Sequence, residues 1–373
     1  MASGTMNHDE RALAYPLGRE APEPGTVREA APGVLWARMR LPFALDHINV
    51  WLLRDALGES ERSPAGAADG WTVVDCGIDD ARTRADWEAI FAAPALGRLP
   101  VVRVVATHMH PDHLGLAHWL CERWNARLWI SATDHAVARR AVDAADGSGG
   151  PRAAAFMASH GLLDEAALQA VRERSTYYRR LVPAVPHEHR RLLDGQTLTV
   201  GPAGERSAWR CHAGHGHAPE HIALDAADRP DGGVLISGDM VLPRISTNVS
   251  VWDVEPEADP LALYLASLAR MRESIGAERL VLPSHGFPFR GLHTRIDQLA
   301  AHHVARLAET LETCGAAPTS ARDLVPVLFR RELDLHQMTF ALGEALFHLH
   351  TLWLEGRLRR SLDADGVFRF RTA

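Results

Sequence analysis

Three histidines and one aspartate fall within six consecutive positions of the segment Thr107-His108-Met109-His110-Pro111-Asp112-His113. Neutral imidazole and carboxylate are ligands of zinc, iron and manganese. The apolar run 101–106 before the motif predicts a buried strand, and Pro111 keeps a helix from starting inside it. The pattern indicates a metal-binding loop at a strand end, short enough to present residues to two neighbouring metals. The alternative is a histidine-rich surface loop, since the chain contains 21 histidines.

Other candidate ligands also lie beside the ends of predicted strands. Segment 212–221 contains four histidines just before the strand predicted at 222–224, Asp239 follows the apolar run 234–236, and His285 follows the run 279–283. Candidate ligands that end a strand or follow it would meet at one edge of a sheet. Asp75 ends another predicted strand, where it either holds a metal-bound imidazole or caps the helix beginning near residue 79. His47 either faces the site or packs nearby.

The motif His108-x-His110-x-Asp112-His113 resembles the signature of the metallo-β-lactamase superfamily, and further motifs in the family's order extend the resemblance over roughly residues 33–305. The resemblance implies a four-layer αββα sandwich with one metal on His108, His110 and His217. It implies a second metal on Asp112, His113 and His285, with Asp239 bridging. His221 would lie nearby, either as a residue behind the ligands or as a proton donor, and Asp75 would lie behind the ligands. His215 is a rival for His217, because a glycine on each side leaves the register free.

The resemblance also implies a chemistry. Two divalent metals, with zinc favoured over iron and manganese, would hold a bridging hydroxide for hydrolysis, with Asp112 and Asp239 as catalytic residues. The commonest zinc β-lactamases have cysteine at the bridging position and a lysine near the substrate, whereas this chain has Asp239 and no lysine. The ligand set is instead similar to that of glyoxalase II, lactonases and the nuclease branch. The sequence contains no Gly-x-Ser-x-Gly elbow for a serine nucleophile.

A thioester, ester or lactone is the favoured substrate, such as an acyl-CoA or a glutathione thioester. A helical insertion at about 133–186 ends in aromatic and cationic residues suited to an acyl substrate with an anionic handle. The candidate substrate residues are Tyr177, Tyr178, Arg244 and Asn248. The alternative is that the tyrosines only pack the helix and do not contact substrate. Two other functions remain open: a metal-dependent endoribonuclease or phosphodiesterase, and a non-catalytic metal-binding regulatory module.

Composition divides the chain into three parts. Residues 1–32 are rich in proline, glycine and charge and predict a flexible N-terminal arm, 33–314 the catalytic domain, and 315–373 a small winged-helix-like domain of helices followed by a hairpin. The last segment, counted from residue 316, carries eight arginines and seven acidic residues. Its net charge of one positive unit disfavours binding to the phosphates of a nucleic acid. Packing or homodimer formation is the favoured role of this domain.

Overall composition narrows the location and partners. The 373 residues are 46% hydrophobic with a net charge of −7, which disfavours nucleic acid as partner and leaves a small acyl molecule. No apolar run reaches about 18 residues, and the N-terminus is too polar for a signal peptide, so a cytoplasmic protein without a membrane partner is expected. Four cysteines without a CxxC pair predict neither a disulfide framework nor a thiolate metal site.

Overall fold

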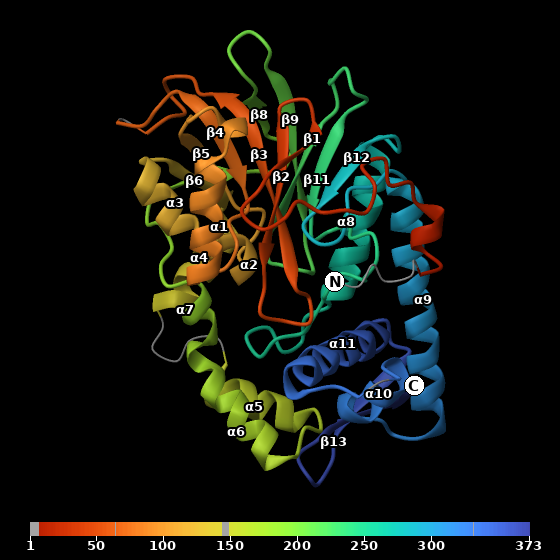
Figure 1. Ribbon diagram of the computed structural model, residues 1–373. Helices are drawn as coiled ribbons and strands as arrows, with labels where there is room; N and C mark the ends of the chain where they lie inside the picture. Colours follow the sequence, from red (N-terminus) through yellow and green to blue (C-terminus); the bar gives the residue numbers. More distant parts are fainter. Residues whose placement is uncertain (1–6, 64, 144–148, 331) are drawn as a thin grey trace.

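Two β-sheets face each other at the centre of the computed structural model, which describes residues 7–63, 65–143, 149–330 and 332–373 (Figure 1). The larger sheet has the order β1-β2-β3-β4-β5-β6-β7 and the smaller β12-β11-β10-β9-β8. The strands of the larger sheet are β1 Arg28–Ala31, β2 Val34–Arg40, β3 His47–Ala56, β4 Asp69–Val74, β5 Val101–Val105, β6 Arg127–Ser131 and β7 His189–Leu192. Those of the smaller sheet are β8 Thr197–Val200, β9 Ser207–Gly214, β10 His221–Ala226, β11 Val234–Gly238 and β12 Leu280–Pro283.

Helices cover the outer face of each sheet. The larger sheet carries α1 Ala81–Ala92, α2 Pro111–Leu114, α3 Ala117–Trp124 and α4 Ala132–Asp143. The smaller carries α8 Pro260–Ser274 and α9 Leu292–Ala316. Three apolar layers follow from this order. Trp51 and Ile222 lie between the sheets, Trp87 packs between α1 and the larger sheet, and Tyr264 packs between α8 and the smaller sheet. The expected four-layer arrangement of helix, sheet, sheet and helix is therefore present.

Strand direction explains where the polar loops gather. β4, β5 and β6 run parallel, so their carboxyl ends meet at one edge of the larger sheet. In the smaller sheet β11 and β12 are parallel and β10 is antiparallel to β11, which places the start of β10 beside the ends of the other two. A backbone hydrogen bond of 2.8 Å from Ile222 to Thr107 joins the two sheets at this edge. The loops that follow six different strands, β4, β5, β6, β9, β11 and β12, are thus brought together.

A helical segment follows β6 before the chain returns to the sheet. It contains α4, α5 Gly150–Ser159, α6 Glu165–Glu173 and α7 Tyr177–Leu181, separated from β7 by a short loop. In Figure 1, α5 and α6 lie away from the sheets and beside the C-terminal helices. The backbone of Arg322 donates to the carbonyl of His160 at 3.1 Å, so the segment is joined to the C-terminal part of the chain.

The N-terminal segment differs from the flexible arm expected for residues 1–32; of these, 1–6 lie outside the described residues. Leu13 is buried in the core beside α9, and Ala14 forms a bridge with Arg290. Glu10 is 1% exposed and accepts from Arg19 at 3.1 Å. The sheet begins with β1 inside this segment, where β1 pairs with β2 across the two-residue turn 32–33.

The C-terminal segment consists of α10 Ala321–Leu328, α11 Leu335–Leu354 and the hairpin β13 Leu358–Leu362 with β14 Phe368–Thr372. These elements match the predicted order of helices followed by a hairpin. Their apolar side chains, including Phe347 and Phe370, join the layer under α8 and α9. None of the helices in the described ranges is both long and apolar enough to span a membrane.

Gly343 marks a close approach between α11 and the loop that follows β11. A Cβ at this position would lie 2.8 Å from Ser250 Oγ and 3.0 Å from Ser250 Cβ. We expect Gly343→Ala to lower the free energy of unfolding by about 1–3 kcal/mol, because the helix and the loop must move apart. The measurement is urea unfolding of the two proteins at equal pH.

The matched control is Gly315→Ala, near the end of α9, where a Cβ would meet only Thr372 Cγ2 at 3.7 Å. Alanine is favoured over glycine in a helix by up to about 1 kcal/mol, so this variant should be neutral or more stable. Equal destabilisation by the two substitutions would contradict the contact with Ser250.

Histidines buried between the helical segment and the hairpin give stability a pH dependence. His160 is 2% exposed and lies between the rings of Phe156 and Phe368. Burial, aided by His350, lowers the pKa of His160 to about 3. The unfolded chain takes up the proton first as pH falls below about 6.5, so stability present above that pH is lost as pH falls from 6.5 toward 3, by about 1.4 kcal/mol per pH unit for one such group.

His160→Phe should therefore reduce the slope of unfolding free energy against pH between pH 6.5 and 4 by the equivalent of one proton. Urea unfolding at several pH values measures this slope. His187→Phe, at an exposed position, is the matched substitution and reports the effect of adding a phenyl ring at the surface. An unchanged slope in His160→Phe would show that its imidazole is protonated equally in the folded and unfolded states.

Candidate metal centre

Three imidazoles meet where the ends of β5 and β9 face each other across the edge. His108 Nε2 lies 2.9 Å from His110 Nδ1 and 3.1 Å from His217 Nε2, and the His110 and His217 atoms are 3.1 Å apart. Nitrogens bound to one tetrahedral zinc ion at about 2.0–2.1 Å would be separated by little more than this. The three nitrogens are therefore spaced like one face of the ligand tetrahedron around a single metal ion.

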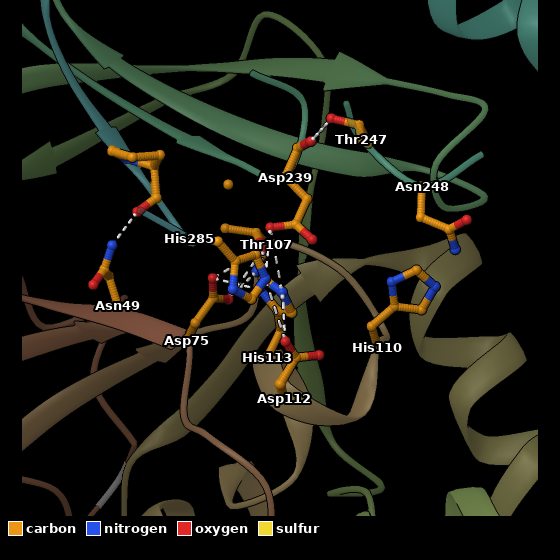
Figure 2. A network of polar contacts seen from close by, with 12 residues as sticks. Asn49, Asp75, Thr107, His110, Asp112, His113, Asp239, Thr247, Asn248 and His285 are labelled. Atoms are coloured by element: carbon orange, nitrogen blue, oxygen red, sulfur yellow. Dashed lines mark hydrogen bonds and ion pairs between the residues drawn. The ribbon is translucent and has the colours of Figure 1, made fainter. Parts of the chain in front are cut away.

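A second group lies beside the first. Asp112 Oδ2 is 3.4 Å from His285 Nε2 and 3.6 Å from His113 Nε2, and the ligand atoms of these three residues form one compact group. In Figure 2, Asp75 lies to one side of this group and His110 with Asn248 to the other. Asp112 and His113 lie in α2, which begins at Pro111, and His285 lies on the loop after β12. The expectation that Pro111 keeps a helix from starting inside the motif is therefore wrong, because proline is favoured at the first position of a helix.

Asp239 connects the two groups. Its Oδ2 lies 3.3 Å from His217 Nε2 in the first group, and its Oδ1 lies 3.4 Å from His285 Nε2 and 3.6 Å from His113 Nε2 in the second. Although burial raises the pKa of the Asp239 carboxyl, His285 and His113 outweigh it and hold the pKa well below its usual range. One carboxylate thus presents a separate oxygen to each group.

Fixed acceptors set the tautomers of the histidines. His217 Nδ1 donates to the carbonyl of Asn248 at 2.6 Å, and His285 Nδ1 donates to the carbonyl of His47 at 2.7 Å. His113 Nδ1 lies 2.8 Å from Asp75 Oδ2. An imidazole that donates through Nδ1 presents the lone pair of Nε2, which is the form that binds a metal.

The arrangement fits cations better than hydrogen bonding. The lone pair of His217 Nε2 points at other imidazole nitrogens 3.1 Å away. His113 Nε2 and Asp239 Oδ1 are buried and have no hydrogen-bond partner among the described residues. Burial lowers the pKa of His108 well below its usual range, so this imidazole is neutral. Buried acceptors without donors are costly, and divalent metals would satisfy them.

Asp75 lies behind the cluster, as one of the two readings of the sequence predicts. Its Oδ1 accepts from the Thr107 backbone at 2.8 Å, and its Oδ2 contacts His113. The cap of α1 is Asp80, which accepts from Thr83, so the alternative role of Asp75 as a helix cap is not the one observed. His47 belongs to the packed alternative, since its Nε2 accepts from the Gly286 backbone at 2.9 Å.

His221 has the first of its two predicted roles, that of a residue behind the ligands, and not that of a proton donor. It is fully buried, and its Nε2 accepts the backbone N–H of Asp239 at 3.1 Å. Burial, followed by the neighbouring His217, keeps the pKa of His221 well below its usual range. A neutral imidazole that accepts this backbone N–H holds the Asp239 turn in place.

Three of the four predicted substrate residues make contacts with other parts of the protein. Tyr178 is 5% exposed and its hydroxyl donates to the Met109 carbonyl at 2.6 Å, so it supports the metal loop and packs the core, a correction to the predicted contact with substrate. Arg244 is exposed and its guanidinium lies 3.9 Å from Glu10, on the N-terminal segment and apart from the ligands. Asn248 contributes its carbonyl to His217, and its side chain accepts from Ser250 at 3.3 Å.

Tyr177 lies near Asp112, on the side of the second group. Its half-buried ring lies 6.4 Å from that of Phe43. Burial raises the pKa of Tyr177, opposed by Arg174 and reinforced by the Asp112 carboxylate. The tyrosine therefore lies within the electrostatic reach of a ligand of the second group.

Asp134 is a site residue that sequence reasoning missed. It follows β6 within the first turn of α4, and its carboxylate accepts from the backbones of Met109 at 2.8 Å and Glu220 at 2.6 Å. The signal was present in the sequence, because Asp134 is another carboxylate just beyond an apolar strand. It was passed over because it begins a helical stretch.

Comparison with known proteins identifies the family. A family model described as Metallo-beta-lactamase superfamily matches residues 44–307, more than half of the chain. The chain belongs to the metallo-β-lactamase superfamily. Members of this superfamily are typically hydrolases, and the His and Asp groups of this chain agree with metal binding by a superfamily hydrolase. A second model, described as Metallo-beta-lactamase-like, C-terminal domain, matches residues 307–373.

Solved structures of similar superfamily proteins cover nearly the whole chain. A beta-lactamase domain protein from Burkholderia ambifaria is 52% identical, with a TM-score of 0.88, over 98% of this chain and 100% of the other. A metallo-beta-lactamase family protein from Thermus thermophilus is 27% identical, with a TM-score of 0.72, over 92% of this chain and 100% of the other. Curated proteins gave no match. The C-terminal domain is therefore part of a shared architecture.

Mutation can test whether His217 or His215 is the metal ligand in segment 212–221. The structure places His217 in the ligand triangle, whereas the His215 ring nitrogen Nδ1 lies 2.8 Å from the Pro219 carbonyl, outside it. We expect His217→Ala to weaken metal binding at least about tenfold, because one ligand is lost, and His215→Ala to leave metal content unchanged. Metal analysis after dialysis against a chelator measures both, and the reverse order would move the ligand to position 215.

Proposed function

We propose that the protein is a dinuclear metal-dependent hydrolase of thioesters, esters or lactones. The proposal rests on the position of the Asp239 carboxylate, which has one oxygen facing His217 and the other facing His285. A carboxylate placed in this way suits two metals held side by side. We assign His108, His110 and His217 to one metal and Asp112, His113 and His285 to the other, with Asp239 between them.

Zinc is the proposed metal, because the donor set consists of imidazoles and carboxylates that zinc, iron and manganese accept, with zinc favoured by its affinity for imidazole. Two bound metals would activate water near neutral pH and polarise the scissile carbonyl. The protein's part is to orient the imidazoles, which the carbonyls of Asn248 and His47 do by accepting the Nδ1 protons of His217 and His285. The Asp239 turn is held by His221, so the carboxylate is positioned before substrate arrives.

Hydrolysis without a protein nucleophile agrees with the state of the cysteines. All four are buried, and burial raises the pKa of Cys121 and Cys211 to about 12. A thiol with a raised pKa carries little thiolate at neutral pH and is a poor nucleophile. Activated water is then the attacking group that the chain can provide.

An acyl substrate is favoured by the surroundings of the centre. Phe43 and Tyr177 form an aromatic pair next to the Asp112 side of the cluster. Because the chain contains no lysine, an anionic handle on the substrate would be bound by arginine. We propose Tyr177 as the substrate contact among the predicted residues.

The C-terminal domain is proposed to complete the fold around the centre and to serve dimerisation, with a winged-helix-like arrangement. Its α11 packs on Ser250 through Gly343, and Ser250 in turn contacts Asn248, whose carbonyl holds His217. This chain of contacts gives the domain a packing role close to a ligand.

The experiment that tests the proposal combines metal analysis with a substrate panel. Purified protein is loaded with zinc, iron or manganese and assayed with an acyl-CoA, a glutathione thioester, a lactone, a phosphodiester and single-stranded RNA. Two metals per chain with turnover of a thioester, ester or lactone would support the proposal. Cleavage of the phosphodiester or RNA alone would replace it with a nuclease function, and metal binding without any turnover would point to a regulatory module.

Asp239→Asn should abolish the binding of at least one metal and lower kcat by about a thousandfold or more, because the amide loses the charge that two cations would share. Steady-state kinetics and metal analysis measure the two effects. Asp225→Asn is the matched control, since Asp225 is also a buried aspartate, paired with Arg279 outside the centre. Full activity in Asp239→Asn would overturn the dinuclear assignment.

A further inference from the structure

The backbone on both sides of the first metal group is held by one buried carboxylate. Asp134 is completely buried, and its Oδ1 accepts the Met109 N–H at 2.8 Å while its Oδ2 accepts the Glu220 N–H at 2.6 Å. Met109 lies between the ligands His108 and His110, and Glu220 lies on the loop that carries His217. The two oxygens of Asp134 thus join the two segments that supply the first group.

Neighbouring side chains strengthen this junction. The Ser131 hydroxyl donates to Asp134 Oδ2 at 3.3 Å. The Thr133 hydroxyl donates to Glu220 Oε2 at 2.7 Å, so α4 holds the Glu220 residue twice. On its other side the Met109 peptide is held by the Tyr178 hydroxyl of α7. The peptide between two ligands is therefore fixed at both its N–H and its carbonyl by the helical segment 132–181.

Hydrogen bonds to both oxygens compensate the burial of the Asp134 carboxylate. Burial raises the pKa of Asp134 to about 6, although the Met109 and Glu220 amides and the Ser131 hydroxyl oppose the shift. Placing a carboxylate in this position is costly unless both oxygens accept hydrogen bonds. Two backbone amides from distant segments satisfy them, and the distance between these segments is then set by the width of one carboxylate.

The second metal group is held by other residues. Asp75 orients His113, and the His47 carbonyl orients His285. Among the described hydrogen bonds, those of Asp134 reach Met109, Glu220 and Ser131, and none reaches Asp112, His113 or His285. The supports of the two groups therefore differ. Asp134 on α4 holds the backbone beside the first group, whereas Asp75 at the end of β4 and His47 at the start of β3 contact the second group directly. Asp75 reaches the first group only indirectly, because Thr107 Oγ1 lies 3.0 Å from both Asp75 oxygens and from His108 Nδ1.

We propose that Asp134 is a positioning residue for the first metal, fixing the separation between the loop of His108 and His110 and the loop of His217, while Asp75 positions the second metal. This inference rests on the proposed dinuclear centre. In Asp134→Asn one oxygen can still accept an amide, but the new NH₂ faces the other backbone N–H, so the two loops are pushed apart. The expected result is loss of one metal only.

The test is a titration of metal-free protein with Zn²⁺ in competition with a chromophoric chelator, with histidine ¹H–¹⁵N spectra to show which imidazoles respond. In wild-type protein two equivalents should bind. In Asp134→Asn one equivalent should bind about 10–100-fold more weakly, with the resonances of His110 and His217 affected. In Asp75→Asn the equivalent reported by His113 and His285 should be weakened more than the other, because Asp75 contacts His113 directly and reaches His108 only through Thr107.

A double-mutant cycle separates positioning from general destabilisation. In a His110→Ala background the first metal is already lost, so adding Asp134→Asn should leave the remaining metal affinity unchanged. Asp225→Asn, which removes a buried carboxylate from β10, is the matched control and should bind both metals as wild type does. Thermal unfolding of the metal-free proteins shows whether each variant is folded.

Asp134→Glu keeps the charge in the same surroundings and moves the oxygens by one methylene, so it provides a second variant if the asparagine protein does not fold. Equal weakening of both metals, or wild-type affinity in a folded Asp134 variant, would overturn the inference. Failure of wild-type protein to bind two metals would overturn the proposed dinuclear function itself, so the two failures are distinguished by the wild-type titration.

Discussion

The metal centre depends on fixed hydrogen-bond acceptors behind its histidines. Each Nδ1 of His113, His217 and His285 is committed to an oxygen, supplied by the Asp75 carboxylate or by a main-chain carbonyl. These acceptors turn three titratable rings into oriented lone-pair donors. Since two of the three oxygens are backbone atoms, the tautomers are set by the path of the chain and are insensitive to most side-chain substitutions.

The backbone path is in turn fixed where the two sheets meet. Asn49 donates its backbone N–H to Ser284 at 2.7 Å and its side-chain amide to Pro283 at 2.8 Å, which joins β3 to the end of β12. Asp75 has a φ of 64°, a left-handed conformation that costs energy in a residue other than glycine. Its contacts with Thr107 and His113 hold it there. Strain at one strand end is thus offset by the hydrogen bonds that organise the ligands.

Local patterns in the sequence predict much of this centre, because apolar runs locate the strands and the residues after them locate the ligands. The sandwich and the placement of His217 in the cluster rest on such patterns together with the family resemblance. Patterns do not reveal contacts between distant segments: Asp134 reaches Glu220, and Tyr178 reaches Met109, through hydrogen bonds that no spacing rule describes. The ordered N-terminal segment was missed for the same reason, since Leu13 gains its burial from α9.

The turn that carries Asp239 also constrains how this sequence can change. Gly238 has a φ of 54°, and a Cβ there would lie 2.1 Å from Nε2 of His221, the atom that accepts the Asp239 amide. A side chain at position 238 is compatible with the fold only if the imidazole at 221 is displaced or replaced. Natural variation at these two positions should therefore be correlated, and a homologue that retains Gly238 and His221 together carries a signature of the same turn even where its other histidines have diverged.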